Sequence, residues 1–109
     1  MSYEYRLVFD DTASAQLVID SLKSSDACVK AQVQEVCLKD RELQTSAEYD
    51  ARLTQEGDRS LWLEVNFRSL NLYNLVQGAL SSRGVRCFED GDWDDEVTLK
   101  EAFRIKSNN

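Results

Sequence analysis

The chain has 109 residues, 42% of them hydrophobic, which suits one compact domain and supplies ample material for one core. Its 13 basic and 20 acidic residues give a net charge of −7, so a polyanion such as DNA or RNA is repelled. It contains no histidine, which removes the usual general base near neutral pH and the commonest metal ligand. We therefore expect a single domain over residues 1–109 that binds another molecule and is not an enzyme.

The start of the chain predicts a strand followed by a helix. Residues 3–9 alternate between apolar and polar side chains, the period of a strand with one buried face. Asp10 and Asp11 then offer acceptors for the free amides of a first helical turn. Apolar residues at helical spacing follow, which predicts an amphipathic helix over residues 12–24.

The middle of the chain predicts strands. Two apolar alternations within residues 28–39 are one step out of phase, which indicates a bulge or a break. A hairpin is predicted over residues 47–68, where two alternating runs flank a polar turn containing Gly57. This alternation assigns Tyr49 and Phe67 to the buried face of the hairpin.

The last third of the chain predicts one more helix and at least one strand. The helix is capped by Ser69 or Asn71, and Gly84 stands where a helix often ends with a left-handed residue. Residues 85–88 predict a short strand, whereas residues 97–105 fit a strand and a helix equally well.

This order of elements predicts an α+β fold, in which two helices pack on one face of a mainly antiparallel sheet. The most specific topology that the order favours is a ferredoxin-like split β-α-β arrangement. Because that fold supports many unrelated functions, it does not by itself indicate what the protein does.

Three cysteines, Cys28, Cys37 and Cys87, are odd in number and form no Cys-x-x-Cys motif. Reduced thiols in a cytoplasmic protein are the simplest interpretation of this spacing. The longest apolar runs have only a few residues, so we expect no membrane-spanning segment.

The charge excess lies in one stretch near the end of the chain. Six acidic residues fall within eight positions with no base among them: Glu89, Asp90, Asp92, Asp94, Asp95 and Glu96. Without these six charges the net charge of −7 becomes −1. Like charges this close repel one another and cost stability, which favours a binding role over a purely solubilising one.

Two tryptophans are candidate contact residues. Trp93 stands among the acids, where a large aromatic side chain suits a binding anchor unless it folds back onto the core. Trp62 points away from the buried face of the hairpin, beside polar neighbours, and is a contact residue if that second face is open.

Residues 90–101 resemble an EF-hand calcium loop. Asp90, Asp92 and Asp94 match its first, third and fifth positions, and Glu101 matches the bidentate twelfth. The sixth position is an aspartate where an EF-hand has glycine, and the preceding residues predict a strand instead of a helix. The loop is therefore a weak calcium candidate, and we expect no resident metal or cofactor.

In size, acidity and lack of catalytic residues the chain is similar to bacterial immunity proteins, which neutralise a co-produced toxin, often a nuclease. The resemblance is one of type and implies a basic protein partner that contacts residues 89–96 and Trp62, with no nucleic acid or membrane involved. The alternative is a ligand-responsive or self-associating regulatory domain, with calcium at residues 90–101 and a homodimer through the sheet face that carries Trp62.

Overall fold

The computed structural model of the chain describes residues 2–81 and 83–106. This part of the chain contains seven strands and three helices, so the fold is α+β. In chain order the elements are β1 (Tyr3–Phe9), α1 (Ser14–Lys23), β2 (Cys28–Gln32), β3 (Glu35–Leu38), β4 (Ala51–Glu56), β5 (Ser60–Val65), α2 (Leu70–Leu80), β6 (Val85–Glu89), β7 (Glu96–Val97) and α3 (Leu99–Ala102).

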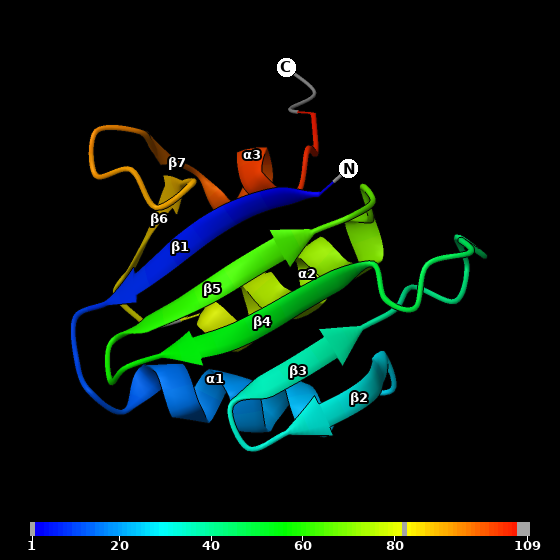
Figure 1. Cartoon of the computed structure of the whole chain (residues 1–109), viewed down its shortest axis with the longest axis horizontal. Helices are drawn as coiled ribbons and strands as arrows, with labels where there is room; N and C mark the ends of the chain where they lie inside the picture. Colours follow the sequence, from blue (N-terminus) through cyan, green and yellow to red (C-terminus); the bar gives the residue numbers. More distant parts are fainter. Residues whose placement is uncertain (1, 82, 107–109) are drawn as a thin grey trace.

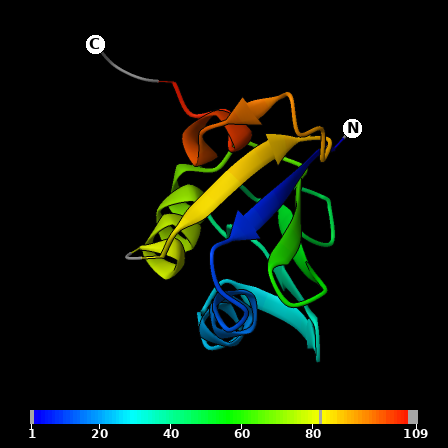
Figure 2. The same cartoon turned by 90° about the vertical axis from the view of Figure 1, so that its left-hand side faces the viewer.

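The strands form one antiparallel sheet in the order β2-β3-β4-β5-β1-β6-β7. Strand β1 therefore lies between β5 and β6, although it comes first in the sequence. The helices lie behind the sheet on one face, and no described helix covers the other (Figure 1, Figure 2). We call this uncovered face, on which Arg6, Arg52 and Trp62 lie, the outer face.

Alternation along the strands determines which side chains enter the core between sheet and helices. Fully buried leucines on the helix side include Leu7, Leu38, Leu53, Leu61 and Leu63. Helix α1 adds Ala15, Val18, Ile19 and Leu22, and helix α2 adds Leu72, Val76 and Leu80. The hydrophobic effect therefore fixes which face of the sheet is covered, and the polar alternate residues are left on the outer face.

The prediction of two helices is wrong, because residues 97–105 contribute a third. Thr98 starts α3 with a capping box: its side chain accepts from the Glu101 amide, and the Glu101 side chain accepts from the Thr98 amide. This reciprocal pair stabilises a helical turn where the apolar pattern alone was ambiguous.

The hairpin of β4 and β5 is confirmed, but it is shorter than the predicted residues 47–68. The assignment of Tyr49 and Phe67 to its buried face is therefore wrong. Tyr49 is half-buried and its hydroxyl donates to Glu64 on the outer face, while Phe67 is 42% exposed. The cause is Asp50, which is fully buried and whose carbonyl accepts the Asn66 amide, so the chain leaves the strand alternation at this point.

The structure also tests the predicted break within residues 28–39 and the predicted left-handed backbone of Gly84. The break within residues 28–39 is confirmed as the turn between β2 and β3, with a register shift between Cys28 and Lys30. The expectation of a left-handed Gly84 is wrong, because α2 is capped by Ser81 and the only positive-φ glycines described are Gly57 and Gly91.

The capping of α1 rests on Asp11. Its carboxylate accepts from the backbone amides of Ala13 and Ser14 at 2.9 and 2.7 Å. These backbone hydrogen bonds lower the pKa of Asp11, and the bond from Ser14 has the larger effect. The predicted acidic cap is therefore present, two residues before Ala13, which precedes the first residue of the helix.

All three cysteines are free; Cys37 and Cys87 are buried, and Cys28 is half-buried. Within residues 2–81 and 83–106, no helix has the length and apolar character needed to cross a membrane.

Candidate functional site

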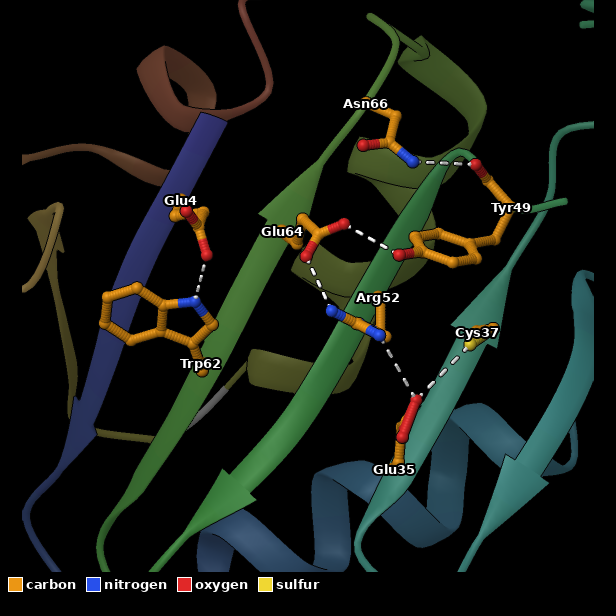
Figure 3. A network of polar contacts seen from close by, with 8 residues as sticks. All are labelled: Glu4, Glu35, Cys37, Tyr49, Arg52, Trp62, Glu64 and Asn66. Carbon is orange, nitrogen blue, oxygen red and sulfur yellow. Dashed lines mark hydrogen bonds and ion pairs between the residues drawn. The ribbon is translucent and has the colours of Figure 1, made fainter. Parts of the chain in front are cut away.

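The outer face of the sheet brings Trp62 together with polar side chains from neighbouring strands. Trp62 on β5 is paired with Arg6 on β1, and Arg6 is paired with Phe88 on β6. The indole Nε1 of Trp62 donates to the Glu4 carboxylate at 2.9 Å (Figure 3). Trp62 is half-buried among these polar neighbours. It lies on the outer face, away from the core, as the alternation in the sequence predicts.

Arg6 lies between the two tryptophans. Its guanidinium carbon is 5.7 Å from the centroid of the Trp62 ring and 5.6 Å from that of Trp93. Its Nε is buried and has no hydrogen-bond partner within residues 2–81 and 83–106, and a carboxylate oxygen of Glu56 is 3.7 Å away. Cation–π contact is therefore the main interaction that fixes this guanidinium.

The loop between β6 and β7 folds against this arginine and tryptophan. The Asp90 amide donates to the Glu4 carbonyl at 2.8 Å, which ties the start of the loop to β1. Gly91 has φ +73°, and a Cβ there would lie 3.1 Å from the Trp62 ring. Glycine suits this position because it adopts a left-handed backbone without steric cost and leaves room for the indole ring.

Trp93 projects from that loop with 60% of its surface exposed. Its ring packs against Phe88, with centroids 4.9 Å apart and planes tilted by 60°. Trp93 therefore does not enter the core between sheet and helices. It rests on the outer face through one part of its ring and presents the rest to solvent.

The acidic stretch at residues 89–96 points outward. All six of its carboxylate residues are exposed. Glu96 pairs with Arg86 through two bonds of 2.8 and 3.2 Å, and the hydrogen bonding by Arg86 lowers the pKa of Glu96. Among the residues that the structure describes, the other five acids form no ion pair with a basic side chain.

A polar network occupies the other half of the outer face. Glu64 accepts from the Tyr49 hydroxyl and from Arg52, both at 2.7 Å, and Arg52 also lies 3.7 Å from Glu35 (Figure 3). Burial, reinforced by Glu64, raises the pKa of Tyr49. Burial alone would lower the pKa of Arg52, but pairing with Glu64 raises it.

The patterns used to choose candidate residues do not point to this network, although the sequence contains a signal for it. Arg52 and Glu64 are opposite each other in the hairpin register, so their charges belong to one cross-strand pair. The position of Tyr49 could not be found in this way, because it lies outside the strand.

A pocket of about 410 Å³ opens beside the network. It is lined by Val29, Lys30, Glu35, Cys37, Glu48, Tyr49 and Arg52. Burial raises the pKa of the Cys37 thiol, which keeps it protonated and poorly nucleophilic near neutral pH. The groups on this face are suited to hydrogen bonding and stacking.

The candidate calcium ligands are not assembled into a site. Within the described residues there is no group of three or more acidic or cysteine side chains that could hold a metal ion. Glu101 is engaged in the capping box of α3, and Asp92 accepts from the Asp94 amide. The element before the loop is β6, so the helix–loop–helix setting of an EF-hand is not formed.

No protein-family model, curated protein or solved structure matches this chain.

Proposed function

We propose that this chain is a small protein-binding module that neutralises a basic protein, in the manner of bacterial immunity proteins acting on a toxin. The observation that carries the proposal is Trp93, 60% exposed within a loop whose aspartates form no ion pair with any described basic side chain. An exposed aromatic ring amid free carboxylates supplies both contact area and charge for a cationic surface.

In this mechanism the carboxylates act first at long range. They steer a basic partner toward the loop and raise its association rate, and they then occupy positions that substrate phosphates would take on a nuclease. Trp93 and Trp62 supply the short-range contact. The proposal includes action in the cytoplasm and no direct binding to nucleic acid, because the same charge repels phosphates.

The test starts from affinity capture of the partner from the cells that produce the chain. Association of the purified pair is then measured by stopped flow at increasing ionic strength. A variant with Asp92, Asp94 and Asp95 changed to asparagine is expected to lower the on-rate about tenfold at low salt.

The matched control changes three exposed aspartates remote from the loop, Asp20, Asp26 and Asp58, to asparagine. It alters the net charge equally, so an equal loss of on-rate would show a general charge effect. A partner that is acidic, or an on-rate insensitive to salt, would contradict the proposal.

We further propose that the centre of the fold is a ferredoxin-like split β-α-β arrangement. Strand β5 separates β1 from β4, and β1 separates β5 from β6, with α1 and α2 as the connecting helices. Strands β2, β3 and β7 extend this centre at its two edges. Nuclear Overhauser contacts of β1 with both β5 and β6 would test the order.

A further inference from the structure

The outer face is held in one arrangement before any partner arrives. Glu4 fixes the Trp62 indole, and Glu64 fixes Tyr49 and Arg52, all through hydrogen bonds of 2.7 to 2.9 Å (Figure 3). Side chains that are already ordered lose little conformational entropy when a partner docks on them. The face is therefore prepared for an interaction although no described element covers it.

The described arginines of this face already lie close to carboxylates of the same chain. Arg52 pairs with Glu64 at 2.7 Å, Arg86 pairs with Glu96 at 2.8 Å, and Arg6 is 3.7 Å from Glu56. Among the described residues of this face, an anionic partner would meet no unpaired arginine and a single unpaired lysine, Lys30, at the edge strand β2. The five unpaired loop carboxylates outnumber this lysine, so the partner that complements this face is cationic.

Trp93 determines which cationic side chain fits. Its ring is already supported by Phe88 and Arg6, and it carries an aspartate on either side in the sequence. A planar guanidinium can stack on an indole and also bind a carboxylate through two parallel bonds, which the ammonium group of lysine cannot do.

We propose that a basic protein docks across the outer face, from the loop between β6 and β7 to Trp62 and Thr54, and that an arginine side chain of this partner stacks on Trp93. This inference rests on the proposed function and specifies its footprint and its recognised group. Arg6, seated against the same ring, is the internal example of the contact.

A second copy of the chain is a poorer occupant of this face. Two copies that each carry a net charge of −7 repel one another, and the arginines on each outer face are engaged internally. Charge repulsion therefore disfavours self-association through this face.

The test uses short peptides on the full chain. An acetylated, amidated Gly-Arg peptide with three arginines is titrated into the ¹⁵N-labelled protein, and the matched Gly-Lys peptide has the same charge. Both tryptophans lie on the outer face, so tryptophan fluorescence excited selectively reports on this face alone. The arginine peptide is expected to bind about two- to fivefold more tightly, with the difference lost in Trp93→Leu.

The changes in backbone amide chemical shift show which part of the outer face the peptide contacts. Shifts at the loop together with Trp62 and Thr54 support the proposal. Shifts confined to the loop, or equal binding of the two peptides, overturn it while leaving the proposed function standing. Binding of neither peptide overturns both. A concentration-dependent dimer in sedimentation, formed through the same amides, replaces the basic partner with a second copy.

A positive charge introduced at the centre of the outer face tests the proposal independently, through the affinity for the captured partner. Thr54→Arg is expected to weaken binding at least about tenfold, whereas the control Asn74→Arg, which adds the same charge at an exposed position of helix α2, leaves it unchanged. If Thr54→Arg does not fold, Val8→Arg on β1 replaces it. Unchanged affinity in a folded variant overturns the footprint.

Discussion

The guanidinium of Arg6 supports the ring of Trp93, its carbon 5.6 Å from the ring centroid, although one residue lies on the first strand and the other in the loop after β6. The contact joins the outer face of the sheet to the loop that carries the acidic charge. Because the Nε of Arg6 has no hydrogen-bond partner in the described part of the chain, the position of this side chain depends largely on the two aromatic rings.

Removing this guanidinium should release Trp93. In a Trp62→Phe background, we expect Arg6→Met to shift the Trp93 emission to the red and to increase its quenching by acrylamide. The loss of stability should be about 0.5–2 kcal/mol, the usual range for a cation–π contact. The control is Arg59→Met, an exposed arginine in the hairpin turn. Identical emission from the two variants would show that Arg6 does not hold the ring.

Two glycines separate the cost of backbone conformation from the cost of close packing. Gly57 and Gly91 have nearly equal φ, +74° and +73°, but a Cβ at Gly57 meets nothing within 4 Å, while one at Gly91 lies 3.1 Å from Trp62. Each alanine variant should lose about 1–2 kcal/mol from the left-handed conformation. Gly91→Ala should lose more in urea denaturation and should change the tryptophan fluorescence, whereas Gly57→Ala should leave it unaltered.

The start of helix α2 is joined to a buried carboxylate. The Ser69 hydroxyl donates to Asp40 at 2.6 Å and accepts from the Leu72 amide, and both Ser69 and Asp40 are buried. Ser69→Ala should therefore lower the free energy of unfolding by about 1–3 kcal/mol, from the lost cap and the lost donor. The exposed Ser21→Ala should change it by less than about 0.5 kcal/mol. Equal effects in thermal melts would contradict this role.

Stability should decrease in acid. Burial alone would raise the pKa of Asp40, but hydrogen bonds from Ser69, the Glu42 amide and Asn71 outweigh it and lower the pKa. The pKa of Asp11 is lowered by hydrogen bonds from backbone amides, of which the one from Ser14 has the largest effect. A carboxylate with a depressed folded pKa stabilises the fold above its unfolded pKa of about 4, and this stability is lost as the pH falls through the folded pKa.

Urea denaturation as a function of pH tests the expected loss of stability in acid. We expect a constant free energy of unfolding at mildly acidic pH and a steep fall below about pH 4. The double variant Asp11→Asn, Asp40→Asn should start lower and show a shallower fall. A fall of the same steepness in the variant would assign the acid sensitivity to other carboxylates.

The three thiols should react in a fixed order. Burial, reinforced by Glu101 and Glu89, raises the pKa of Cys87 to about 12, and burial also raises the pKa of Cys37. Cys28 is only half-buried. Mass spectrometry after iodoacetamide treatment at pH 8 should find Cys28 modified first, with the others protected until urea is added. Early modification of Cys87 would show that its strand opens locally.

Much of the fold follows from local patterns. The alternation in residues 3–9 predicts β1 because every second side chain, such as Leu7, enters the core. Helical spacing predicts α1 and α2 for the same reason, and Gly57 marks the turn of the β4–β5 hairpin. Patterns of this kind fail where one tertiary contact outweighs them, as at Asp50, whose burial takes Tyr49 out of the alternation.

The amino-acid sequence by itself determined the local quantities: the apolar period of each element, the cluster of acids around Trp93 and the side of the strand on which Trp62 lies. Only the tertiary structure decided which elements meet. It placed β1 between β5 and β6, which brings Arg6 to both tryptophans and Glu4 to the acidic loop. These contacts depend on strand order, and strand order results from burying all the apolar faces at once, which no local pattern records.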